Sequence, residues 1–132
     1  MSVTPNAPRL LFFAGSARTG SHNMRLARLG ATIAEANGIA ATFADLGDYA
    51  MPLYDADVQN SAGFPPGAQG LAGRIQAADG LMISSPEYNY SMPGTLKNAI
   101  DWISRMKPMP LRGKHGFLLA ASSSLVGGIR GL

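Results

Sequence analysis

The stretch LMISSPEYNYSMPG, residues 81–94, decides the predicted fold of this chain. Its apolar first half predicts a buried β-strand that ends in two serines, and the residues that follow predict an amphipathic helix. Pro93 would fix the first turn of that helix, with Ser91 as its cap. The apolar residues at helical spacing are Leu96, Ala99, Ile100 and Ile103. A polar loop at the carboxyl end of a strand is where open α/β sheets bind ligands, so residues 86–93 form the first candidate site.

Strands and helices alternate along the rest of the chain. The predicted strands occupy residues 10–14, 39–46, 80–85 and 116–121. The predicted helices occupy residues 21–36, 68–78 and 93–106. The expected apolar face of the first helix consists of Leu26, Leu29, Ile33 and Ala36, and that of the second of Leu71 and Ile75. Residues 47–70 predict a long irregular loop. This order indicates one α/β domain over residues 1–132, a three-layer sandwich around a parallel sheet.

Composition excludes several classes of protein. The 132 residues contain no cysteine, which excludes disulfides, thiolate metal sites and a catalytic thiol. No apolar run is long enough to span a bilayer, and residues 1–8 do not resemble a signal peptide, so we expect a cytoplasmic protein with no membrane partner. A net charge of +3 produces only a weak field for attracting a polyanion. Basic side chains are clustered only in residues 105–114. A solvated helix end followed by a loop explains this cluster best, an anionic small molecule such as a dinucleotide comes second, and nucleic acid comes third, so we expect no nucleic-acid partner.

Three strand-to-helix loops should meet at one edge of the sheet, because the carboxyl ends of parallel strands lie together. They are residues 15–23, 86–93 and 122–128. The first is neither a Walker loop nor a dinucleotide fingerprint. Its hydroxyls, its Asn23 amide, Arg18 and a helix N-terminus suit a phosphate monoester. A tight turn with Ser21 as N-cap explains the same residues equally well.

Two motifs resemble the NADPH-dependent FMN reductase family. The pattern Gly-Ser-x-Arg-x-x-Ser-x-Asn stands at residues 15–23, and Pro-Glu-Tyr-Asn-x-Ser-x-Pro-Gly-x-Leu-Lys-Asn-Ala-Ile-Asp-Trp stands at residues 86–102. The resemblance implies a flavodoxin-like fold with strand order 2-1-3-4. Family members are typically longer by a helix, a strand and a helix, so the domain is expected to be incomplete at its carboxyl end.

The resemblance also implies a cofactor and a site. FMN would be bound and reduced by NADPH or NADH, and a quinone, flavin or similar acceptor would take the electrons. The implied phosphate-binding residues are Ser16, Arg18, Ser21 and Asn23. The implied ring-binding residues are Pro86, Glu87, Tyr88 and Asn89, with Ser122, Ser124, Gly127 and Gly128 near the ring or ribityl chain. No catalytic side chain and no metal are expected, because the flavin performs the hydride transfer.

Several alternatives remain open at this point. The chain could be a flavodoxin-type electron carrier, although such carriers are usually acidic, or an inactive fragment of a reductase. The family resemblance implies a homodimer or homotetramer, and an exposed stripe of Asn98, Trp102 and Arg105 would suit that interface. Packing of Trp102 on the edge of the core is an equal alternative. At least one of Tyr88 and Tyr90 is expected to contact another subunit, His22 and His115 to be structural or solvated, and the aspartates of residues 45–57 to serve turns.

Overall fold

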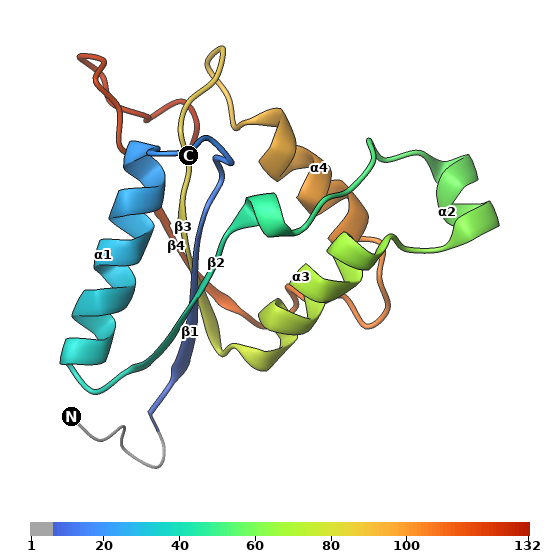
Figure 1. Ribbon diagram of the computed structural model, residues 1–132, viewed down its shortest axis with the longest axis horizontal. Coiled ribbons are helices and arrows are strands. Elements are labelled where there is room, and N and C mark those ends of the chain that lie inside the picture. Colours follow the sequence, from blue (N-terminus) through green and yellow to red (C-terminus); the bar gives the residue numbers. More distant parts are fainter. Residues whose placement is uncertain (1–6) are drawn as a thin grey trace.

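The structure is a computed structural model that describes residues 7–132, so most of the amino-terminal stretch considered for a signal lies outside the described residues. Four parallel strands form one sheet in the order β2-β1-β3-β4, as the resemblance implied. The strands are β1 (Arg9–Ala14), β2 (Ala40–Ala44), β3 (Gly80–Ser84) and β4 (His115–Leu119). The helices are α1 (His22–Ala36), η1 (Leu46–Asp48), α2 (Ala56–Ala62), α3 (Pro66–Ala77) and α4 (Gly94–Ile103). Helix α1 covers one face of the sheet and α3 and α4 the other, which confirms the three-layer sandwich (Figure 1).

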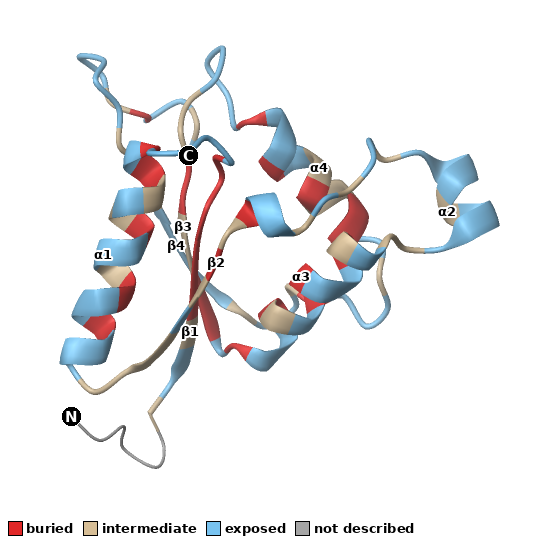
Figure 2. Ribbon diagram, in the orientation of Figure 1, coloured by how far each residue is buried: buried red, intermediate tan, exposed pale blue. Residues whose placement is uncertain are grey.

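The core lies mainly between the sheet and helices α3 and α4, where burial is concentrated (Figure 2). Leu71 and Ile75 of α3 are buried there, as their spacing predicted, and so are Leu96 and Ile103 of α4. The predicted Ser91 cap is wrong, because Pro93 occupies the N-cap position of α4 and its first residue is Gly94. The last strand is also shorter than predicted and ends at Leu119.

The predicted apolar face of α1 is wrong. The helix buries Asn23, Ala27, Ala31 and Ala34, whereas Leu29 and Ile33 are more than half exposed. The reason is close approach to the sheet: a Cβ added at Gly30 would lie 2.1 Å from the Met82 Cε atom. The side of the helix that is buried against the sheet carries small residues, and two of them, Ala31 and Ala34, pack with Phe12. Hydrophobicity alone therefore selected the wrong side of the helix.

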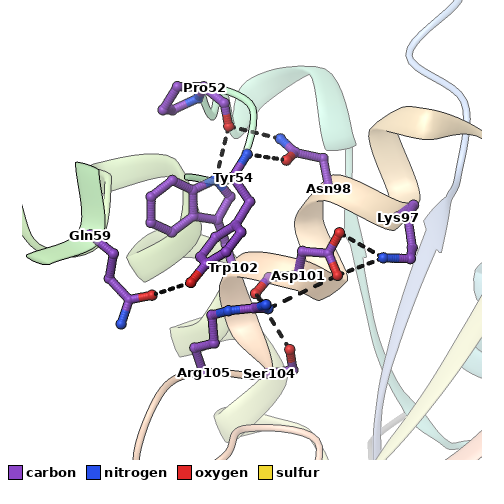
Figure 3. A network of polar contacts seen from close by, with 9 residues as sticks. All are labelled: Pro52, Tyr54, Gln59, Lys97, Asn98, Asp101, Trp102, Ser104 and Arg105. Atoms are coloured by element: carbon purple, nitrogen blue, oxygen red, sulfur yellow. Dashed lines mark hydrogen bonds and ion pairs between the residues drawn. The ribbon is translucent and has the colours of Figure 1, made fainter. Parts of the chain in front are cut away.

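The segment predicted to be irregular, residues 47–70, contains part of η1, all of α2 and the start of α3. Trp102 of α4 is fully buried. Figure 3 shows the contacts that join it and its neighbours to this segment. The Pro52 carbonyl accepts hydrogen bonds from the Trp102 indole N–H at 2.8 Å and from the Asn98 amide at 2.9 Å. The Asn98 oxygen accepts from the Tyr54 backbone N–H at 2.8 Å, and the Arg105 guanidinium lies 3.7 Å from the Tyr54 ring centroid. The stripe proposed for subunit contact is used within the chain, which confirms the core-edge alternative for Trp102.

On the face of the sheet that carries α1, strand β4 is not covered by the helix. Phe12, Met82 and Phe117 are paired across β1, β3 and β4 and lie in one row, with Phe117 62% exposed. Together with neighbouring residues of the same strands they line a shallow apolar cavity of about 210 Å³. Among the described strands, β4 pairs with β3 alone. An edge strand with an exposed apolar face follows from this arrangement.

Asn23 ties together the strand ends that surround the first loop. Its amide N–H₂ donates to the Ala121 carbonyl at 3.0 Å, and its oxygen accepts from the Ala121 backbone N–H at 2.8 Å. The same oxygen accepts from the Ser84 hydroxyl at 2.9 Å. The amino-terminal turn of α1 is thereby joined to the ends of β3 and β4, across 61 and 98 residues of sequence.

We predict that Asn23→Ala lowers the free energy of unfolding by about 2–3 kcal/mol, because it leaves the buried Ser84 hydroxyl and the Ala121 backbone groups without partners. Urea unfolding without any ligand measures this. Asn37→Ala, which removes one exposed hydrogen bond to Ile33, is the matched control and should cost well under half as much. Equal costs for the two variants would contradict the role of Asn23 as a cross-link.

A second prediction concerns the start of β1. Arg9 donates to the Asp79 carboxylate from its backbone N–H at 2.8 Å and from its guanidinium at 3.0 Å, and these bonds lower the pKa of Asp79 to about 2. Because this pKa is lower in the folded chain than in the unfolded chain, the stabilisation is present above the ordinary value of 3.8 and is lost as the pH falls towards 2. Asp79→Asn should therefore lower the urea midpoint at pH 7, and the difference should shrink below about pH 4.

Asp57→Asn, on the exposed helix α2, controls for the loss of one negative charge. A deficit of Asp79→Asn that stays constant as the solution is acidified would refute the contribution of this ion pair.

Candidate functional site

The loops after β1, β3 and β4 emerge at the same edge of the sheet, at the top of Figure 1. Between them lies a shallow cavity of about 160 Å³. Its lining residues are Ser16, Arg18, Ser21, His22, Asn23, Pro86, Tyr88, Ala121, Ser122 and Ser123. All three loops contribute to it, as the parallel arrangement predicted. Seven of the twelve residues predicted to form the site line this cavity.

The first loop is shaped by close packing and by its own hydrogen bonds. A Cβ added at Gly15 would lie 3.0 Å from the Leu96 side chain of α4, so glycine lets this loop pass close to the helix. The Arg18 backbone N–H donates to the Ser16 hydroxyl at 3.3 Å, and the Ser21 N–H donates to the Arg18 carbonyl at 3.1 Å. Arg18 itself is exposed beside the cavity. The turn therefore presents one guanidinium above two buried serines.

Ser21 precedes α1, but its side chain makes no capping hydrogen bond. Ser21 does occupy the N-cap position at the end of a tight turn, as the alternative predicted, but the helix does not use its hydroxyl. The first turn of a helix leaves its backbone N–H groups without partners in the helix, and Ser21, His22 and Asn23 all line the cavity. Such a terminus favours an anion through these N–H groups and through the helix dipole.

The Asn23 side chain, by contrast, is already used. Its donor and its acceptor bind Ala121 and Ser84, and the residue is buried. The implied role of this amide as a phosphate ligand does not fit that geometry, which leaves the Asn23 backbone N–H as the group that could meet an anion. The amide instead holds the cavity wall together.

In the second loop, residues 86–93, some side chains line the cavity and others do not. Pro86 and Tyr88 line the cavity, whereas Glu87 and Asn89 do not. The Glu87 carboxylate accepts from the Arg130 backbone N–H and from the Arg130 Nε, each at 3.2 Å. Tyr88 remains half-exposed at the cavity, and Tyr90 is exposed beyond it. Pro86 and Tyr88 thus face the cavity, whereas Glu87 contacts Arg130 in the segment that follows the third loop.

The third loop contacts the cavity through Ser122 and not through Ser124, Gly127 or Gly128. Ser124 is held within the loop: its N–H donates to the Ser122 hydroxyl at 3.1 Å, and its hydroxyl donates to the Gly127 carbonyl at 2.9 Å. Gly127 has a φ of +62°, and a Cβ added at Gly128 would lie 2.4 Å from the Ala120 Cβ. These glycines shape the loop that carries Ser122.

Three cavity residues were not among the predicted ones, namely His22, Ala121 and Ser123. The place of His22 could have been inferred, because it is the first helical residue after the hydroxyl-rich turn. Ser123 lies within the serine run of the third loop.

The aspartates of residues 45–57 were predicted to serve turns. Two of them, Asp45 and Asp55, cap η1 and α2 through their side chains, which agrees with that prediction. Within residues 7–132, no helix has the length and apolar character to cross a membrane.

Comparison with known proteins agrees with the motifs. Residues 8–132 match the profile of the family described as NADPH-dependent FMN reductase. A quinone reductase of Escherichia coli is 47% identical over 116 residues, which cover 88% of this chain and 61% of that protein. An NAD(P)H-dependent FMN reductase of Pseudomonas aeruginosa is 42% identical over 125 residues, covering 92% of this chain and 64% of that protein.

Among solved structures, the flavoenzyme NAD(P)H:(acceptor) oxidoreductase FerB of Paracoccus denitrificans superimposes with a TM-score of 0.79 at 29% identity, covering 95% of this chain and 66% of that one. This chain spans 61–64% of the length of these two curated relatives. The profile match extends over nearly all of the chain and includes all three loops of the cavity. The chain belongs to the NADPH-dependent FMN reductase family.

Proposed function

We propose that this chain binds FMN at the cavity between its three loops and serves the transfer of a hydride from NAD(P)H, through the flavin, to a quinone or flavin acceptor. The observation that carries the proposal is the convergence of hydroxyls, a guanidinium and a helix N-terminus at one cavity, in a chain of this family. The names of its relatives, a quinone reductase and an FMN reductase, support the class of acceptor.

The phosphate end of the cofactor fits the first loop. Ser16 and Ser21 would donate hydroxyl hydrogen bonds, Arg18 would supply the compensating charge, and the first turn of α1 would supply backbone N–H groups. A dianionic phosphate needs several donors, and this loop brings them to one point. The Asn23 side chain is not assigned to the phosphate, because Ala121 and Ser84 already occupy its donor and its acceptor.

The ring end is assigned to the other two loops, with Pro86, Tyr88 and Ser122 at the cavity. A bound flavin supplies the chemistry of accepting and releasing a hydride, so the protein has to bind and orient rather than transfer protons. Glu87, Asn89, Ser124, Gly127 and Gly128 are proposed to act by shaping these two loops. No side chain is proposed as a catalytic acid or base.

We also propose that the chain works as a homodimer or homotetramer in the cytoplasm. Helix α2 buries none of its seven residues and projects away from the sheet (Figure 1), and Leu53 before it is 83% exposed. Tyr88 and Tyr90 offer further exposed aromatic surface beside the cavity.

The phosphate assignment predicts that Arg18→Ala weakens FMN binding by about tenfold or more, because a charged hydrogen bond of this kind contributes about 1.5–3 kcal/mol. Riboflavin, which lacks the phosphate, should bind the variant and the original chain equally well. Quenching of flavin fluorescence during titration measures both affinities. Arg25→Ala, an exposed arginine of α1 outside the cavity lining, is the control and should change neither.

Mixing the FMN-loaded chain with NADPH in the absence of oxygen distinguishes a reductase from an electron carrier or a binding fragment. Rapid loss of the oxidised flavin absorbance is expected of a reductase. Absorbance that persists after mixing would overturn the reductase activity and leave an electron carrier or a binding fragment. A chain that binds neither FMN nor riboflavin would overturn the proposal as a whole.

A further inference from the structure

The loop that carries Tyr88 contains a strained two-residue turn. The Tyr88 N–H donates to the Ser91 carbonyl at 2.9 Å, and the Ser91 N–H donates to the Tyr88 carbonyl at 3.1 Å. The two central residues, Asn89 and Tyr90, have φ values of 50° and 66°. Asparagine tolerates this left-handed conformation, but a bulky aromatic residue rarely adopts it. Contacts of Tyr90 outside the turn can offset the cost of this conformation.

Arg130 contacts the residue before this turn and one of its two central residues. Its Nε and its backbone N–H donate to the two different oxygens of the Glu87 carboxylate, each at 3.2 Å. Its guanidinium also lies over the Tyr90 ring, 4.1 Å from the centroid, in cation–π geometry. The Glu87 side chain is only 11% exposed, so this ion pair is shielded from water on one side. One residue thus binds the position before the turn and the strained position within it.

The backbone around Arg130 is fitted to the same loop. A Cβ added at Gly131 would lie 3.3 Å from the Glu87 Cα and from the Pro86 carbonyl oxygen. The segment that follows the third loop therefore packs directly on the residues that precede Tyr88. This packing connects the second and third loops of the cavity outside the cavity itself.

We propose that Arg130 is a positioning residue, which holds the Tyr88–Ser91 turn in its strained conformation through Glu87 and Tyr90 and so sets the ring-binding wall of the cavity. Glu87 acts with it, as the partner of Arg130 and not as a flavin ligand. The link to the ring rests on the proposed function. The role of Arg130 in maintaining the turn does not depend on any ligand and applies to the free chain.

Hydrogen exchange of the chain without FMN tests this role of Arg130. Arg130→Ala should speed exchange of the Tyr88 and Ser91 amides by about fivefold to tenfold, the combined effect of a partly shielded ion pair and a cation–π contact. Adding Tyr90→Gly to Arg130→Ala should restore protection, because glycine adopts the left-handed conformation without strain. Arg25→Ala is the control. Unchanged exchange in Arg130→Ala, or no recovery in the double variant, would overturn the proposal.

Ligand titration tests the connection with the cavity. Arg130→Ala should weaken FMN and riboflavin by the same factor, in contrast to Arg18→Ala, which should weaken FMN alone. A loss confined to FMN would overturn the assignment of Arg130 to the ring end. Faster amide exchange in a chain that binds no flavin at all would uphold the role of Arg130 in the turn while refuting the proposed function, so the two failures are distinguishable.

Discussion

The side-chain amide of Asn23 is the interaction on which the binding edge of this molecule depends. The first loop, the end of β3 and the end of β4 are far apart in sequence, and three hydrogen bonds to one buried residue bring them together. A buried amide has to satisfy its donor and its acceptor, and here one partner is the last residue of β3 and the other lies two residues beyond β4. The spacing of the three loops, and with it the shape of the cavity, follows from this constraint.

The order of strands and helices along the chain could be predicted from the sequence pattern because the signals for a parallel sheet are local. Short apolar runs such as residues 10–14 and 80–85, each followed by a polar turn and a helix, specify strands covered on both faces. The meeting of the three loops then follows from topology without any knowledge of side-chain packing. The family motifs at residues 15–23 and 86–102 supplied the strand order and the cofactor that periodicity could not.

Side-chain roles were harder to predict, because they depend on which groups find partners across the fold. From the sequence, Asn23 was interpreted as a phosphate ligand, but the structure shows that its amide is bonded to Ala121. Glu87 was interpreted as a ring contact, but its carboxylate is bonded to Arg130. The face of α1 was chosen wrongly for a steric reason, since close packing against Met82 selects alanine over leucine. Trp102 could be placed only when the connection carrying Pro52 was seen to fold back on α4.

The edge position of β4 has a kinetic consequence for the cavity. A strand that pairs with one neighbour among the described strands opens more readily than a central strand, because fewer backbone hydrogen bonds have to break. Ala121, which follows β4 by two residues, supplies two of the three bonds of Asn23. Fraying of β4 therefore dismantles the cavity wall as well as the sheet margin. The lifetime of the assembled site is therefore tied to the pairing of β4 with β3.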